Sequence, residues 1–184
     1  MIAEQTKTVV STKESPMRKI RIEKITLNIG AGTEPDNVDK AVALLNKISG
    51  VKAVKTVSQK RIAQWKLRPG LPVGAMVTLR GKKAEELLKL LLKSVDNEIK
   101  KSSFMKNGFS FGIKEYIEIP GVKYDPKIGI IGLEVAVSLS RPGFRVKRRK
   151  IRQAKISPKH EISAEDAWQW TSQTFGLIAK EEEE

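Results

Sequence analysis

The chain has 184 residues, a formal net charge of +14 at pH 7 and no cysteine. A chain of this length can form one domain with a substantial hydrophobic core, and the lack of cysteine excludes disulfides and thiolate metal sites. No apolar run approaches the ~18 residues that a membrane span needs. The N-terminal residues 1–16 also lack the pattern of a signal peptide. We therefore expect a cytoplasmic protein without a membrane partner.

The basic residues are concentrated in two stretches that contain no acid. Residues 40–84 include eleven Lys or Arg and residues 135–160 include nine, so together they hold twenty of the 35 basic residues and none of the 21 acidic ones. Such sorting predicts a surface that faces fixed negative charge, and a phosphate backbone is the densest partner of that kind. The alternative is a pair of basic loops that stay in solvent.

Hydrophobic periodicity predicts a single domain at residues 17–178, between a flexible polar extension at 1–16 and an acidic tail at 179–184. In chain order, alternation of period two predicts strands at 24–29, 52–57, 73–80, 109–113, 117–119 and 133–140. Apolar residues at helical spacing predict helices at 38–48, 82–99 and 163–175. A long basic loop is expected at 58–72.

Local signals refine these elements. The opposite parity of Ile22 and Ile25 predicts a bulge near the start of the first strand. Gly50 is placed to end the first helix, and Ser163 with Asp166 has the spacing of a capping box. These are signals of backbone geometry and imply no chemistry.

Strands with one polar face, interleaved with helices, indicate an α+β fold in which helices pack on one face of an antiparallel sheet. The other face would be open and rich in short hydrogen-bonding side chains. Those expected there are Thr26, Asn28, Thr56, Thr78, Ser138 and Ser140. Such a face suits contact with the sugar hydroxyls and phosphates of RNA.

Motifs for catalysis or cofactor binding are weak. Gly30 and Gly32 follow a strand, but the third glycine of a dinucleotide fingerprint is absent, so a tight turn is the better interpretation. His160 is the only histidine, and without cysteine it predicts neither a metal cluster nor a Cys/His pair; we expect it on the surface or facing RNA. We therefore expect no enzymatic activity, no metal and no cofactor.

The second basic stretch contains the densest charge. Its core is Arg145, Lys147, Arg148, Arg149, Lys150 and Arg152. Because no acid lies nearby in the sequence, ion pairing is not expected to neutralise them, and we predict contact with phosphates. A nuclear localisation signal or heparin patch is the alternative. In the first stretch, Trp65 could stack on an unpaired base or pack on its own domain.

Several strings resemble one family. They are 25–32 (ITLNIGAG), 48–50 (ISG), 68–74 (RPGLPVG), 77–81 (VTLRG) and 124–126 (YDP). In this order they are similar to the ribosomal protein, fifth of the large subunit in the universal naming, that binds 5S ribosomal RNA. The resemblance extends over about residues 18–176. The strings RPGF, KRR and HEIS after residue 140 resemble its archaeal and eukaryotic branch.

The resemblance implies a structural, non-enzymatic role in the central protuberance of the large subunit. It implies contacts with 5S rRNA, large-subunit rRNA, P-site tRNA, neighbouring ribosomal proteins and a bridge partner in the small subunit. Together with the charge pattern, the rRNA-binding candidates are Asn28, Thr56, Lys60, Arg61, Thr78, Arg80, Arg145, Lys147, Arg148 and Arg149. The tRNA-contacting loop is predicted at Arg68, Pro69, Gly70, Leu71, Pro72, Val73 and Gly74, as a stiff projecting turn.

Two regions depart from bacterial relatives, which have a longer Gly-rich stretch in place of 105–111 and lack the basic segment 141–159. Contacts there are not transferred from that branch. The competing class is a free-standing nucleic-acid enzyme or chaperone, for which the basic stretches hold no carboxylate to bind a divalent metal.

Overall fold

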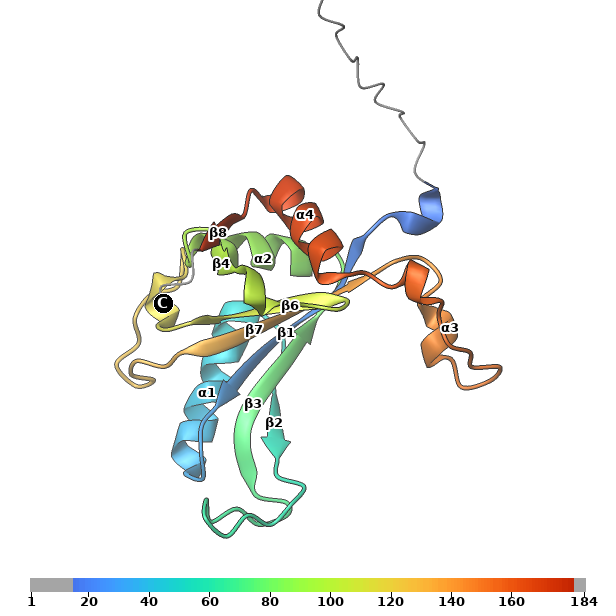
Figure 1. Cartoon of the computed structure of the whole chain (residues 1–184). Coiled ribbons are helices and arrows are strands. Elements are labelled where there is room, and N and C mark those ends of the chain that lie inside the picture. The colour runs from blue at the N-terminus through green and yellow to red at the C-terminus, as the bar shows by residue number, and fades with distance from the viewer. Residues whose placement is uncertain (1–14, 181–184) are drawn as a thin grey trace, which may run out of the picture.

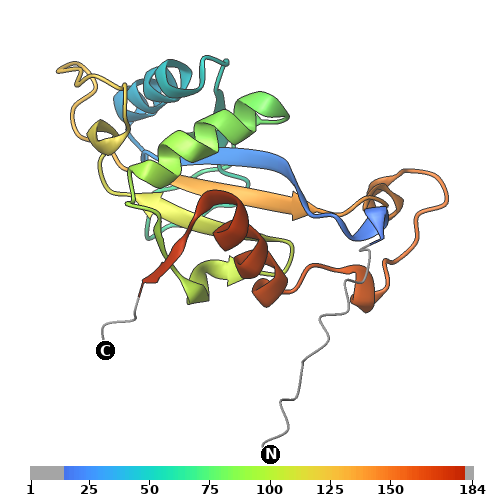
Figure 2. The same cartoon turned by 90° about the horizontal axis from the view of Figure 1, so that it is seen from above.

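Residues 15–180 of the chain are described by a computed structural model, and they form a six-stranded antiparallel sheet with helices packed on one face (Figures 1 and 2). In spatial order the strands are β2 (Val54–Val57), β3 (Pro72–Leu79), β1 (Arg21–Gly30), β7 (Leu133–Ser140), β6 (Gly108–Ile113) and β5 (Phe104–Met105). The helices on the covered face are α1 (Pro35–Ser49), α2 (Lys82–Lys93) and α4 (Ala164–Phe175). The predicted α+β architecture is confirmed.

The smaller elements lie outside this layer pair. Strands β4 (Glu98–Lys100) and β8 (Ile178–Lys180) form a parallel pair, which the sequence had not indicated. The short helix α3 (Arg145–Arg148) projects beyond the end of the sheet (Figure 1). Single turns of 3₁₀ helix occupy Pro16–Arg18, Lys101–Ser103, Tyr116–Glu118 and Pro158–His160.

The core fills the space between the sheet and the three helices. In β1, the central strand, Ile25, Leu27 and Ile29 are each at most 2% exposed. Ile25 lies opposite Leu79 of β3 and Val137 of β7, both buried. Burying an aliphatic side chain of this size contributes roughly 1.5–3 kcal/mol, so the alternating pattern fixes which face of each strand is covered.

Three local predictions are confirmed. The pairing of β1 with β7 shifts register between Ile22 and Lys24, where the bulge was expected. Helix α1 ends at Gly50, whose φ of 62° is left-handed and whose amide donates to the Asn46 carbonyl. The capping box of α4 is formed in full by Ser163 and Asp166.

The predicted helix at 82–99 is too long. It ends at Lys93 because Asp96 and Asn97 adopt left-handed φ angles of 51° and 57°, which a helix cannot continue through. Ile99, which is 3% exposed, is therefore buried in strand β4 and not on a helix face.

The predicted strand at 117–119 is also wrong. Residues 116–118 form a 3₁₀ turn, because the buried Tyr116 anchors it and its hydroxyl accepts a hydrogen bond from the Asp125 amide at 3.0 Å. At the C-terminus, β8 occupies the first residues of the expected acidic tail; residues 181–184 and most of the N-terminal extension, 1–14, lie outside the described residues. Within the part that is described, none of the helices combines the length and apolarity needed to traverse a membrane.

Candidate nucleic-acid interface

The face of the sheet opposite the helices carries the predicted polar side chains. Pairing places Thr26 beside Thr78, and Asn28 sits on the same face of β1. Thr56 on the edge strand β2 lies opposite Gly74 of β3. This surface, called the open face below, comprises Val54, Thr56, Gly74, Met76, Thr78, Lys24, Thr26, Asn28, Gly30, Glu134, Ala136, Ser138, Gly108, Ser110 and Gly112. Its centre holds the predicted hydrogen-bonding groups.

Two glycines of the open face allow neighbouring strands to approach closely. A Cβ on Gly74 would collide with the Ile29 carbonyl oxygen, and one on Gly108 would collide with the Val137 carbonyl oxygen. These two glycines are therefore required by strand packing. The resulting surface can lie close to a nucleic-acid backbone over several strands.

Some residues of the open face were not among the candidates. Met76 and Val54 are exposed apolar side chains, suited to contact with a ribose or base. Glu134 accepts a hydrogen bond from the Asn28 side chain, with 3.3 Å between Nδ2 and Oε2. Alternation along β7 predicts that Glu134 lies on this face, but an acidic side chain is not expected to bind a phosphate backbone, so it was not among the candidates.

Ser140 does not belong to the open face as expected. It is 3% exposed, because it lies beyond the β1 bulge and lines a crevice with Phe144 and Arg148 at the root of the basic segment. Thr56, Asn28 and Thr78 remain on the face, and Arg80 follows β3 with an exposed side chain.

The loop between β2 and β3 is a hairpin extension, residues 58–71, that projects from one end of the sheet (Figure 1). Its tip is a turn at 63–66, closed by the paired Ile62 and Leu67. Trp65 at this tip is 65% exposed, so it is not packed on its own domain. Lys60 and Arg61 are exposed on the ascending limb.

The predicted tRNA-contacting loop is divided by the structure. Arg68 to Leu71 form a turn with Pro69 and Gly70 at its centre, where the Gly70 φ is 85° and the Leu71 amide donates to the Arg68 carbonyl. Ser58 bonds to both Gly70 and Leu71, which ties this turn to the base of the hairpin. Pro72, Val73 and Gly74 belong to β3. The predicted turn is present at Arg68–Leu71, but the projecting tip is 63–66.

The basic segment 141–160, called the arm below, leaves the opposite end of the sheet and contains α3 (Figure 1). Within it, Arg148 forms an ion pair with Glu23 of β1, and Lys147 Nζ lies 3.6 Å from Glu161. The expectation that ion pairing does not neutralise the basic cluster is therefore wrong for Lys147 and Arg148, because the fold supplies acids that are distant in sequence. Among the described residues, Arg145 and Arg149 form no ion pair.

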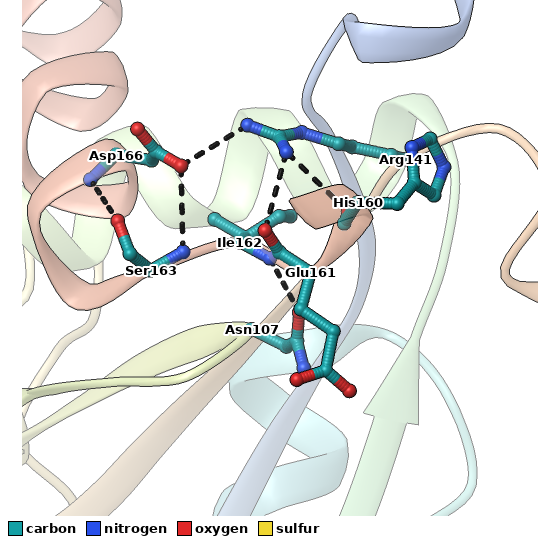
Figure 3. Close-up of polar contacts among 7 residues, drawn as sticks. All are labelled: Asn107, Arg141, His160, Glu161, Ile162, Ser163 and Asp166. Carbon is teal, nitrogen blue, oxygen red and sulfur yellow. Dashed lines mark hydrogen bonds and ion pairs between the residues drawn. The ribbon is translucent and has the colours of Figure 1, made fainter. Parts of the chain in front are cut away.

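Arg141 anchors the arm to the body of the protein (Figure 3). Its side chain is 10% exposed; it donates to the carbonyls of His160 and Glu161 at 3.3 and 3.2 Å, and to Asp166 at 3.2 Å. Asn107 holds the next peptide by accepting from the Ile162 amide. Charge-assisted hydrogen bonds of this kind fix the two ends of the arm to the body.

His160 also has a structural role. Its Nε2 lies 2.9 Å from the Pro142 carbonyl oxygen, and its ring packs near Phe144. It closes the base of the arm and is half-buried there, and the expectation that it faces RNA stays a prediction. Within residues 15–180, no three His, Asp or Glu side chains gather as metal ligands would.

Comparison with known proteins identifies the family. The family model described as "Ribosomal protein L5" matches residues 15–68, and the model for the C-terminus of the same ribosomal family matches residues 72–166. A protein of Nanoarchaeum equitans named "Large ribosomal subunit protein uL5" is 53% identical over 89% of this chain and 98% of its own length. One of the same name from Sulfurisphaera tokodaii is 47% identical over 91% and 96%. The chain therefore belongs to the ribosomal L5 family, in its archaeal form, as a structural constituent of the large ribosomal subunit.

Proposed function

We propose that the chain binds 5S rRNA with the open face and helps attach it in the central protuberance of the large subunit, in the cytoplasm. The observation that supports this proposal is that the two acid-free stretches place basic segments at opposite ends of the sheet. The hairpin, from the first stretch, extends from one end of the sheet, and the arm, from the second, extends from the other. A polar sheet face that lies between the basic hairpin and the basic arm suits a bound RNA backbone.

The two kinds of contact have different tasks. Cationic side chains such as Lys60, Arg61 and Arg80 neutralise phosphates, which supplies affinity that depends on salt. Hydroxyl and amide groups such as Thr56, Thr78 and Asn28 hydrogen-bond to sugars and base edges, which fixes orientation. The work is positional and not enzymatic.

The hairpin suits a second RNA partner. Its tip stands away from the sheet, and Trp65 presents an exposed aromatic ring there beside the exposed Lys66. Aromatic rings next to cations stack on unpaired bases or pack on riboses. We assign this tip, with the turn at Arg68–Leu71 as its support, to P-site tRNA.

The arm is assigned to rRNA of the large subunit. Arg145 and Arg149, at the start of α3 and directly after its end, form no ion pair among the described residues, so both are available as phosphate ligands. Neighbouring ribosomal proteins and a small-subunit bridge partner complete the proposed contacts.

Two measurements test the proposal. In sucrose gradients of cell extract, the protein should sediment with large subunits, whereas a free-standing enzyme or chaperone would form a free pool. Purified protein should bind 5S rRNA with an affinity that falls by about 10³-fold or more between about 50 and 200 mM salt, if six or more phosphates are neutralised. A flat salt response would refute the role of the basic ends.

A further inference from the structure

We propose that the open face contains, at its hairpin end, a pocket for one unpaired nucleobase, with Glu134 as the acceptor for the base and guanine as the base that fits. This inference rests on the proposed function in one respect, namely that RNA lies on this face. It adds a site of sequence recognition to a surface otherwise described by phosphate and sugar contacts.

The site is a hollow of about 400 Å³ where β7 begins short of the end of β1. The last pair between β1 and β7 is Asn28 with Glu134, so Gly30 at the end of β1 has no partner on that side. Gly112 of β6, which pairs with Glu134, and Lys114 line the hollow on the side opposite β1. Ligand sites typically have volumes of about 300–1,000 Å³, so the hollow can take a planar base.

At two positions that line the hollow, neither the backbone conformation nor the packing of the protein requires glycine. Neither Gly30 nor Gly112 has a positive φ, and a Cβ built on either meets nothing within 4 Å. This contrasts with Gly74 and Gly108, where a side chain would collide with backbone. Glycine inside a strand weakens it and often marks a place where a ligand approaches closely. The absence of side chains at Gly30 and Gly112 leaves the space of the hollow open to a ligand.

Glu134 is the one carboxylate among the described residues of the open face, and it forms no ion pair there. On a surface that meets phosphates, a carboxylate is repelled unless it accepts hydrogen bonds from the ligand. An ionised carboxylate is an acceptor only, so its ligand must present N–H or O–H donors, which in RNA are the N–H groups of the bases and the ribose 2′-hydroxyl. A base edge, unlike a single hydroxyl, can present two adjacent donors to the two carboxylate oxygens. The Asn28 amide, whose Nδ2 already donates to Oε2, holds the group in place.

Guanine matches this set of groups best. Its Watson–Crick edge presents two adjacent N–H donors, which can engage both carboxylate oxygens, whereas adenine and cytosine present a single amino group. Its O6 is an acceptor, and Lys114, which is exposed and lines the hollow, is the cationic residue that can donate to it. Paired bases cannot offer this edge, so the ligand is a base splayed out of a loop or bulge.

The first test compares Glu134→Gln with Glu86→Gln, a matched change of charge on the exposed side of α2, away from the sheet. We expect Glu134→Gln to weaken binding to 5S rRNA by about five- to a hundredfold, while binding to a scrambled RNA of equal length is unchanged or tighter. Glu86→Gln should weaken neither. The inference is overturned if Glu134→Gln binds 5S rRNA as tightly as the wild type. That result would also follow if Glu134 only oriented Asn28, because Gln keeps an acceptor.

The second test fills the hollow. Gly30→Ala and Gly112→Ala should leave the melting temperature unchanged or raised, since the methyl groups meet no protein atom, yet each should weaken 5S rRNA binding severalfold. Unchanged 5S affinity in both variants would exclude a ligand from the hollow. A variant that loses 5S affinity while its melting temperature falls would instead show that the glycine serves the fold.

A titration separates this inference from the proposed function. In NMR spectra of the full chain, 5′-GMP should shift the amide signals of Gly30, Gly112 and Gly132 more than 5′-AMP does, and Glu134→Gln should remove the difference. If the wild type fails to prefer 5S rRNA over scrambled RNA, the proposed function fails while the titration still reports on the pocket. Equal or absent shifts with the two nucleotides overturn the assignment of guanine.

Discussion

Replacing Thr26 and Thr78 by valine should weaken 5S rRNA binding without harming the fold. The two threonines lie opposite each other on β1 and β3, and Thr78 is exposed. Valine keeps the side-chain shape and favours strands, so the free energy of unfolding should change by less than about 0.5 kcal/mol. Each lost hydroxyl removes a hydrogen bond worth about 1 kcal/mol in the complex, or roughly fivefold in affinity. The double variant should therefore bind about 30-fold more weakly, less if the two hydroxyls share one RNA group.

Equilibrium binding at one fixed salt concentration and thermal unfolding of the same samples measure the two effects separately. The matched control is Thr174→Val on α4, which removes an exposed hydroxyl from the helix side of the molecule. It should leave 5S rRNA affinity unchanged. The reasoning is refuted if the Thr26/Thr78 double variant stays folded and binds 5S rRNA like the wild type. Loss of folding would contradict the expected small change in the free energy of unfolding and show that the two hydroxyls stabilise the sheet.

Two further predictions concern the ends of the sheet. The double variant Arg145→Gln/Arg149→Gln should reduce the slope of log K against log salt for rRNA binding by about 1.5. The variant Lys147→Gln/Arg148→Gln has the same change of charge but should reduce the slope by less, because those two residues already form ion pairs with acids. Equal reductions would contradict the distinction between paired and unpaired cations of the arm. Trp65→Ala should weaken P-site tRNA on assembled ribosomes by about tenfold and spare 5S rRNA binding, and a parallel loss of both would show that hairpin and sheet are one surface.

Local periodicity was sufficient to predict most strands and the side of the sheet that is open. It located the bulge after Ile22, the stop at Gly50 and the cap at Ser163, because each depends on residues that are adjacent in sequence. It failed at the end of α2, where the apolar spacing continues while the backbone turns left-handed at Asp96. Periodicity describes which side chains are apolar and not whether the chain stays helical.

Charge in sequence was a poorer guide to the partners of single residues. Arg148 appears unopposed in the sequence, yet β1 brings Glu23 to it across the sheet end. Arg141 is the first residue of the basic segment, yet its guanidinium donates hydrogen bonds to two backbone carbonyls and to Asp166. Both outcomes depend on long-range packing, which leaves no signal in a single sequence. A count of basic residues therefore exceeds the number of phosphates that they can bind.

The middle and the ends of the molecule are thus different kinds of surface. The centre of the open face holds hydroxyls, an amide and glycines, so it adds little long-range attraction and is sensitive to shape. The hairpin and the arm hold the cations, which attract RNA over about a Debye length but do not select its sequence. The carboxylate of Glu134 opposes the attraction of RNA to the basic hairpin and arm. Its position beside Gly30 and Gly112 is most simply explained by a base that donates hydrogen bonds to it. The affinity of the protein for RNA and its choice of RNA can therefore be altered independently.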